Sequence, residues 1–328
     1  MVLRTVCAAL IWLSFLATAQ AQCVGENLID ALAPANRDAL TVAAHAEPFA
    51  TGNLWQATRG DETLYLTGTF HLDDPRHDAL MARLLPYLAK SKTLLVEAGP
   101  KEEAELQQKL AKDPGAMMNL AGSGLQDLLP PEDWEQLTAA LLQRGIPSSI
   151  AEKLRPWFVS MMLSLPPCAL QMAAKGGGLD KRLIVAATER QIPIASLEPF
   201  DTALNLFDGL SREEQILMIR NALLIEQQSA DYLITTADMF FAGESRLIWE
   251  LSRRIANDVP GTTPEQTDAD FAQAEKTLIA DRNRNWIPAI EAALKQGPAL
   301  AAFGALHLSG KEGVLALLEA QGFTVEPL

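Results

Sequence analysis

Two of the four histidines in this chain occupy the same short pattern, Gly-x-x-His, near opposite ends of the sequence. Gly68-Thr69-Phe70-His71 and Gly304-Ala305-Leu306-His307 each follow a run of residues typical of a β-strand. A strand delivers its last side chain to one edge of a sheet, and a glycine just before it lets the backbone bend or another group approach closely. Two such strands in one sheet would bring His71 and His307 together, which suits a metal site or an acid–base pair.

Two glutamates end similar apolar runs and are the next candidates. Glu97 follows Leu94-Leu95-Val96, and Glu198 follows Ile194-Ala195-Ser196-Leu197. A carboxylate at the end of a buried strand must be ion-paired, hydrogen-bonded or bound to a metal, because burying it alone is costly. We therefore predict that Glu97 and Glu198 are site residues. The sequence does not indicate which of them is a ligand and which is a base.

Other polar residues have competing interpretations. Arg282 lies in the polar run 281–286, which is usual for a solvated helix face. If it points into a site, it would bind a carboxylate or stabilise an oxyanion. Asp180 follows three glycines and has the position of an acid at the start of a helix. His77 is predicted to be a loop residue, and His45 a structural residue in an N-terminal helical segment.

Strand signals cluster at the two ends of the chain, and helical signals lie between them. Strands are predicted at 53–58, 62–69, 93–97, 192–197, 299–304 and 323–327, and a helical middle at about 101–295. Helices at 78–89 and 311–320 follow the two Gly-x-x-His strands, and each leads to a strand that carries a glutamate, Glu97 or Glu326. This weak internal β–α–β repeat predicts an α/β fold with one central sheet, whose functional side chains lie at strand carboxyl ends.

The N-terminus predicts an exported protein. Arg4 precedes an apolar run, and Ala19-Gln20-Ala21 has the small-x-small form of a signal-peptide cleavage site. We predict a signal peptide at 1–21 and a single domain at 22–328, located in the periplasm or secreted. No later run is long and apolar enough to span a bilayer. In an oxidising compartment the two remaining cysteines, Cys23 and Cys168, favour a disulfide over two buried thiols.

Charge and missing motifs exclude several classes of protein. The net charge of −14 argues against general nucleic-acid binding and against docking to anionic lipid. The sequence has no His-Glu-x-x-His, no Gly-x-Ser-x-Gly, no P-loop and no paired Cys-x-x-Cys. The expected partner is a peptide or another small-molecule substrate, and the oligomeric state is not indicated.

The order of these motifs resembles that of the TraB/GumN (Tiki-like) family. The matching motifs are Leu54-Trp55, Gly68-Thr69-Phe70-His71, Leu95-Val96-Glu97, Arg155-Pro156-Trp157, Gly178-Leu179-Asp180, Ser196-Leu197-Glu198, Arg282-Asn283 and Gly304-Ala305-Leu306-His307-Leu308 with Gly310. The resemblance implies an α/β fold similar to the erythromycin esterase and ChaN haem-binding group. It also implies a site in which His71, His307 and Glu97 match metal-site residues and Arg282 matches a family arginine.

The resemblance does not imply a single activity, because the members of the family differ in function. The animal Tiki members are metal-dependent proteases that use manganese- or cobalt-type ions, whereas other members are pheromone-shutdown or polysaccharide-associated proteins without a settled reaction. The C-terminal membrane anchor of Tiki has no counterpart in this sequence, which leaves the substrate open.

Three functional hypotheses follow. The first is an exported metal-dependent hydrolase, with a peptidase as the expected class, that holds manganese, cobalt or zinc through His71, His307 and Glu97. In this hypothesis Glu97 or Glu198 takes the proton of the water, and Arg282 stabilises the oxyanion. The second is a non-catalytic periplasmic protein that sequesters a peptide or small ligand. The third is a metal-free esterase with a histidine as general base.

Overall fold

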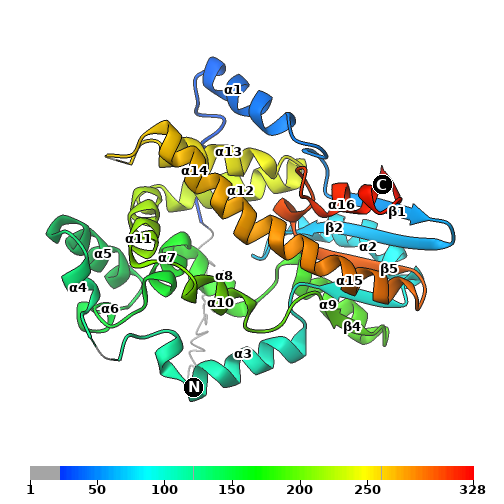
Figure 1. Cartoon of the computed structure of the whole chain (residues 1–328), viewed down its shortest axis with the longest axis horizontal. Coiled ribbons are helices and arrows are strands. Elements are labelled where there is room, and N and C mark those ends of the chain that lie inside the picture. The colour runs from blue at the N-terminus through cyan, green and yellow to red at the C-terminus, as the bar shows by residue number, and fades with distance from the viewer. Residues whose placement is uncertain (1–22, 121, 260) are drawn as a thin grey trace, which may run out of the picture.

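The computed structural model of the protein describes residues 23–120, 122–259 and 261–328 (Figure 1). The predicted signal peptide, 1–21, lies outside the described residues. Within them, no helix is both long enough and apolar enough to cross a membrane. The described chain forms one mixed sheet with many helices around it, which confirms the predicted α/β fold.

The sheet combines strands from both ends of the sequence. Its strands are β1 (Leu54–Arg59), β2 (Glu62–Thr69), β3 (Thr93–Val96), β4 (Ile194–Ser196), β5 (Ala299–Gly304) and β6 (Thr324–Pro327). Their order across the sheet is β4-β3-β5-β2-β1-β6. The neighbours β4, β3, β5 and β2 are parallel, whereas β1 runs antiparallel to both β2 and β6. The carboxyl ends of four neighbouring strands therefore meet at one edge of the sheet.

The C-terminal strand β5 lies between β2 and β3. All four residues of β3 are buried, and so are the first five of β5, as expected for parallel strands covered on both faces. The register pairs Thr69 with Gly304 and Val96 with Ala302. The three strands therefore end at nearly the same level, which brings together the segments that follow them.

Helices cover both faces of the sheet (Figure 1). On one face, α15 (Asp281–Leu294) and α16 (Val314–Ala320) pack through side chains such as Trp286 and Leu315. On the other face, α2 (His77–Lys90) and α9 (Leu179–Glu189) pack through side chains such as Leu84 and Leu183. Because α9 and α15 begin at the carboxyl-end edge, the residues of their first turns lie beside the strand ends.

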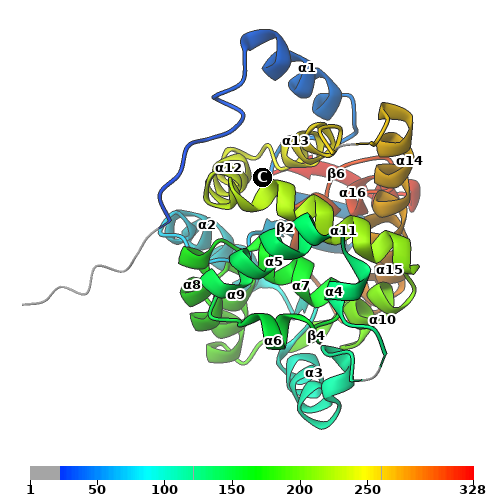
Figure 2. The same ribbon diagram turned by 90° about the vertical axis from the view of Figure 1, so that its left-hand side faces the viewer.

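The remaining helices lie around the sheet and its covering helices (Figure 2). These helices are α1 (Pro34–His45), α3 (Pro100–Lys112), α4 (Leu125–Leu128), α5 (Pro131–Gln143), α6 (Ser148–Ala151), α7 (Pro156–Ser164), α8 (Leu170–Lys175), α10 (Thr202–Asp208), α11 (Arg212–Glu226), α12 (Ser229–Ala242), α13 (Arg246–Ala256) and α14 (Pro264–Glu275). Of these, α12 packs through Phe240 into the cluster shared with α2 and α9. Buried leucines and isoleucines of α5, α7 and α11 form a hydrophobic cluster of their own. The predicted helical middle is confirmed, and β4 interrupts it where a strand was predicted.

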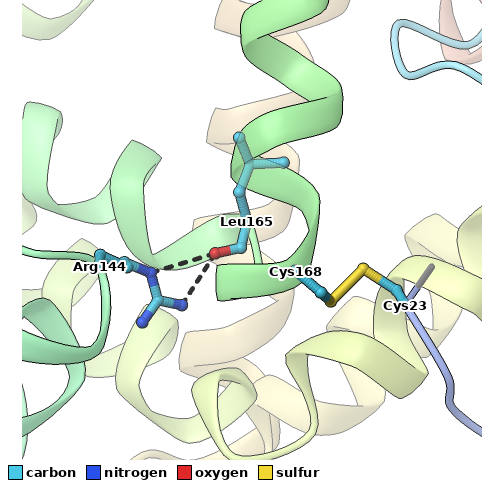
Figure 3. The surroundings of a disulfide bond; sticks show 4 residues. All are labelled: Cys23, Arg144, Leu165 and Cys168. Carbon is cyan, nitrogen blue, oxygen red and sulfur yellow. Dashed lines mark hydrogen bonds between the residues drawn. A yellow bond between two sulfur atoms is a disulfide. The ribbon is translucent and has the colours of Figure 1, made fainter. Parts of the chain in front are cut away.

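A disulfide ties the N-terminal segment to this helical part. Cys23 and Cys168 are bonded with their Cα atoms 5.3 Å apart, across 145 residues of sequence (Figure 3). The turn that carries Cys168 is held on its other side by Arg144, which donates two hydrogen bonds to the carbonyl of Leu165. The predicted pairing is therefore present in the structure.

One prediction needs correction. His77 is not a loop residue: it is the first residue of α2 and is fully buried, because its ring packs against Phe70, Phe240 and Phe241 while Nε2 donates to the carbonyl of Leu72. The predicted β–α–β repeat is present, since β2–α2–β3 and β5–α16–β6 each join two strands that run in the same direction. β6 lies at the far end of the sheet from β3, separated from β5 by β2 and β1, so Glu326 is exposed and remote from the strand ends that meet.

Candidate functional site

Four predicted site residues follow the four parallel strands. His71 and Glu198 lie two residues beyond β2 and β4, Glu97 follows β3 directly, and His307 ends a 3-10 turn after β5. The carboxyl ends of parallel strands are the usual place for a ligand in an open α/β sheet. The packing of the two motifs is close, since a Cβ on Gly68 would lie 2.8 Å from the Cβ of Ala305. Only glycine at 68 lets the second motif rest on the first.

Gly304 marks the point on which three of these side chains converge. A Cβ built on Gly304 would lie 3.3 Å from Oε1 of Glu97, 3.7 Å from Cδ2 of His307 and 3.8 Å from Nε2 of His71. The structure therefore brings His71, Glu97 and His307 together in one place, as the spacing of the motifs predicts. A Cβ at position 304 would press on Glu97 and reach van der Waals contact with both imidazoles.

Arg282 lies at the centre of this cluster rather than on a solvated helix face. Its Nη2 donates to Oε2 of Glu97 at 2.7 Å and to Oε1 of Glu198 at 2.8 Å, and its Nε donates to Oε2 of Glu198 at 2.9 Å. Its Nη1 lies 3.2 Å from Nε2 of His307. A π-helical turn, Lys276–Ala280, precedes α15 directly, and such turns are frequent at functional sites.

The two glutamates differ in their contacts. Both oxygens of Glu198 accept hydrogen bonds from Arg282, and Oε2 also accepts one from the indole nitrogen of Trp286 at 3.1 Å. Glu198 therefore holds the guanidinium in place. Glu97 accepts a hydrogen bond from the backbone N–H of Gly304 at 2.6 Å as well as the one from Arg282.

The pKa of Glu97 reflects these contacts. Burial alone would raise the pKa, but the positive charges of His307, Arg282 and His71 and the Gly304 N–H lower it to about 2. At the pH at which Glu97 titrates, His307 is itself protonated, which is why it contributes a charge. Glu97 is therefore a carboxylate throughout the physiological range.

His71 is held by the start of α9. Its Nδ1 lies 3.1 Å from Oδ1 of Asp180, and the backbone N–H of Leu179 donates to the carbonyl of Phe70 at 3.0 Å. A Cβ on Gly178 would lie 2.3 Å from the carbonyl oxygen of His71, so the glycine permits this close approach. The hydrogen bond to Asp180 raises the pKa of His71 to about 9, against the effect of desolvation. The imidazole is thus a cation at neutral pH, and its side chain remains 64% exposed.

His307 has the opposite environment. His307 is 3% exposed to solvent, and the centroid of its ring lies 4.4 Å from the centroid of the Trp286 ring. Nδ1 lies 2.6 Å from Oδ1 of Asn283. Burial lowers the pKa of His307 to about 4, and the charges of Arg282 and His71 act in the same direction, against Glu97. At neutral pH this imidazole is therefore uncharged.

Sequence reasoning missed two members of the site. Asp180 was interpreted only as an acid at the start of a helix, yet it is also the partner of His71. Asn283 received no separate role, although it contacts His307. The available signals were a triple glycine just before Asp180 and the neighbouring position of Asn283 and Arg282 in the resemblance.

A divalent ion at this place would need donor atoms from His71, Glu97 and His307. Imidazole and carboxylate are suitable ligand types, but no group of three or more His, Cys, Asp or Glu in the described part of the chain could hold a metal ion. Nε2 of His307 faces the guanidinium, and both oxygens of Glu97 already accept hydrogen bonds. As they lie, these residues do not fit an ion shared among His71, Glu97 and His307. The metal stays a prediction.

Comparison with known protein families agrees with the order of the motifs. The model of the TraB/PrgY/gumN family matches residues 53–327, a range that includes every site residue named above. The chain therefore belongs to this family. No curated protein matches it.

Proposed function

We propose that this member of the TraB/PrgY/gumN family is an exported hydrolase that cleaves an ester or amide bond in a peptide or small molecule. The observation that carries the proposal is the pair of imidazoles at Gly304, one cationic and one neutral at neutral pH. Neighbouring titratable groups whose pKa values are driven apart by their environments are typical of acid–base catalysis.

In the proposed reaction His71 is the general acid. Its pKa of about 9 keeps the imidazole protonated at neutral pH, and Asp180 orients the ring through Nδ1, which leaves Nε2–H for the leaving group. As Nη1 of Arg282 turns from Nε2 of His307 towards the carbonyl oxygen, a water oxygen attacks the carbonyl carbon, and the proton of that water passes to Nε2 of His307. The carbon–oxygen or carbon–nitrogen bond then breaks as His71 protonates the departing alkoxide or amine. Exchange with solvent restores both imidazoles.

Arg282 supplies the positive charge nearest to His307. Its guanidinium cannot lose its proton at any relevant pH, and Glu198 holds it by two hydrogen bonds. The Nη1–H that faces His307 is the donor that can turn to a carbonyl oxygen and stabilise the negative charge that develops there. In this proposal Glu198 is a positioning residue. Glu97 orients Arg282 from the other side and offsets part of its charge.

A metal-dependent peptidase, the function predicted first from the sequence, is the second candidate. The observation that favours it is that Nδ1 of each imidazole contacts a side-chain oxygen, of Asp180 or of Asn283. This contact orients the ring and leaves Nε2 free, as is usual for histidines that bind metals. The candidate requires Arg282 to withdraw from His307 and Glu97, and manganese, cobalt and zinc are all compatible with these donors.

Two observations support export. The first 21 residues have the form of a signal peptide. Cys23 and Cys168 are paired, and disulfides persist mainly in oxidising compartments. We therefore place the proposed hydrolase in the periplasm or outside the cell.

The test is turnover of two substrate panels, a fluorogenic peptide library and a series of aryl esters, by untagged protein with and without a chelator. We expect turnover that resists the chelator and is lost in His71→Ala and Glu97→Gln. His45→Ala is the matched control, because His45 is a surface residue that pairs with Glu244. Loss of activity with the chelator, together with stoichiometric manganese, cobalt or zinc in the untreated protein, would instead select the metal-dependent candidate.

The third alternative is a binding protein without catalysis. It predicts no turnover of either panel, together with saturable binding of a peptide or ester that His71→Ala weakens. That result would overturn the proposed hydrolase while leaving the site in place.

A further inference from the structure

We infer that Asn283 is a positioning residue that fixes the tautomer of His307, so that Nδ1 carries the proton and Nε2 presents a lone pair to the site. The inference rests on the proposed function only for its consequence in catalysis. The geometry itself is independent of which reaction the site performs.

The orientation of the Asn283 amide follows from its surroundings. Asn283 is fully buried, and its Nδ2 lies 2.8 Å from the carbonyl oxygen of Glu312 and 3.3 Å from that of His307. Carbonyl oxygens only accept hydrogen bonds, so the NH₂ end of the amide must face them. A flipped amide would place its oxygen against two carbonyl oxygens and leave the buried NH₂ without these acceptors.

The proton on the imidazole follows from this orientation. Because NH₂ faces the two carbonyls, Oδ1 is the atom 2.6 Å from Nδ1 of His307. An amide oxygen only accepts, so Nδ1 must donate and must carry the proton. In a neutral imidazole the other nitrogen is then unprotonated.

Arg282 imposes the same tautomer from the opposite side of the ring. Its Nη1 lies 3.2 Å from Nε2 of His307, and a guanidinium is a donor with no acceptor. Nε2 must therefore accept. Two neighbouring residues of α15, one against each ring nitrogen, thus agree on a single protonation pattern. For His71 the structure shows a partner at Nδ1 alone, the Asp180 carboxylate.

The tautomer has a direct consequence for the site. A proton on Nε2 would set two donors against each other at 3.2 Å and would drive the guanidinium away from His307. With the proton held on Nδ1, the lone pair of the ring is at Nε2, where it accepts from Arg282 and can take a proton from water once Nη1 withdraws. Asn283 therefore acts through His307 and has no need to touch the substrate.

The test is a long-range ¹H–¹⁵N correlation spectrum of the disulfide-bonded, ligand-free protein labelled with ¹⁵N-histidine, recorded at neutral pH. Single His→Gln substitutions at His45, His71, His77 and His307 assign the four rings. For His307 we expect a pyrrole-type Nδ1 and a pyridine-type Nε2. The opposite pattern in the wild-type protein would overturn the inference without any assay of turnover.

Two variants separate positioning from mere support of the fold. Asn283→Asp keeps an acceptor for Nδ1 and should preserve a pyrrole-type Nδ1. Asn283→Leu removes that acceptor and leaves the contact with Arg282, so it should shift part of the His307 population to the other tautomer and move both ¹⁵N shifts away from the wild-type values. Asp180→Asn is the matched control, since it changes the partner of His71 and should leave His307 unchanged. If folded Asn283→Leu retained the wild-type His307 pattern, Asn283 would not set the tautomer. If Asn283→Leu does not fold, the wild-type spectrum still decides whether Nδ1 or Nε2 of His307 carries the proton.

Discussion

The two Gly-x-x-His segments have the same local pattern and opposite environments. After β2, His71 is largely open to solvent, faces a carboxylate and has a raised pKa. After β5, His307 is buried beneath Trp286, faces an amide and has a lowered pKa. The shared pattern places each ring at the same edge of the sheet. The partner of Nδ1 and the degree of burial determine the charge that each ring carries.

This difference indicates that the two histidines are not interchangeable copies. At neutral pH His71 carries the proton that a general acid needs, and His307 is uncharged, as a proton acceptor must be. Each of the four predictions below tests one side of this contrast.

The largest expected effect is on catalysis. Removing either ring should lower turnover by about 10²- to 10⁴-fold, the range that general acid–base groups contribute. His71→Ala and His307→Ala would be compared with His45→Ala on the best substrate from the panels, with circular dichroism to verify folding. Wild-type turnover by a folded His307→Ala protein would show that only one segment has a chemical role.

The second effect is on stability, on the His307 side of the contrast. Arg282→Met should lower the free energy of unfolding by about 3–5 kcal/mol, because it leaves the mostly buried carboxylates of Glu97 and Glu198 without their counter-charge. Urea unfolding of both proteins measures the change. Arg284→Met is the matched control, since its two ion pairs are largely exposed and should contribute less than about 1 kcal/mol. Equal losses in the two variants would contradict the buried network.

The third effect is the acid dependence of stability. His307 has a folded-state pKa of about 4, below the unfolded value near 6.5, so the unfolded chain binds more protons as the pH falls between them. We expect the free energy of unfolding to fall by about 3 kcal/mol from this group between pH ~6.5 and ~4. Glu97, with its pKa of about 2, adds a loss at still lower pH.

Urea unfolding across this pH range, for the wild-type protein and for His307→Gln, isolates the contribution of His307. The slope between the two pKa values should be smaller in the variant. An unchanged slope in folded His307→Gln would mean that other groups account for it.

The smallest effect is on the alkaline side and belongs to His71. Its pKa of about 9 lies above the unfolded value, so its contribution to stability is complete below pH ~6.5 and is lost as the pH rises towards the folded-state pKa. Because the ring is 64% exposed, solvent screens the interaction and the loss should be smaller than that for His307. Asp180→Asn should move the pKa of His71, followed by NMR titration, down towards its usual value. If the pKa of His71 were unchanged in Asp180→Asn, Asp180 would not be the cause of the difference in charge between His71 and His307.

Local pattern was sufficient to predict the strands and the residues that end them. The β2 and β5 ranges are those predicted, the other strand boundaries shift by at most two residues, and His71, Glu97, Glu198 and His307 lie at the strand ends where they were expected. These features depend on short apolar runs and on the glycines beside them, which are properties of neighbouring residues. The α/β class follows from the order of these strands and helices, whereas the Cys23–Cys168 pairing was predicted from the cysteine count and the expected oxidising compartment.

Pattern alone failed where a residue depends on distant partners. His77 is preceded by a polar loop in the sequence, yet in the fold it is buried against two phenylalanines of α12. Arg282 lies in a polar run and still reaches Glu97, 185 positions away. Glu198 resembles a base until its hydrogen bonds to Arg282 and Trp286 are seen.

By itself, then, the sequence determined which side chains end the strands and that two histidines and two carboxylates were available for one site. Only the tertiary structure decided that β5 lies between β2 and β3, that Arg282 enters the cluster, and that the two imidazoles differ in charge. The physical reason is that strand ends follow from local hydrophobicity and backbone preference. Protonation depends on burial and on partners such as Asp180 and Asn283, which reach their histidines only when the helices pack against the sheet.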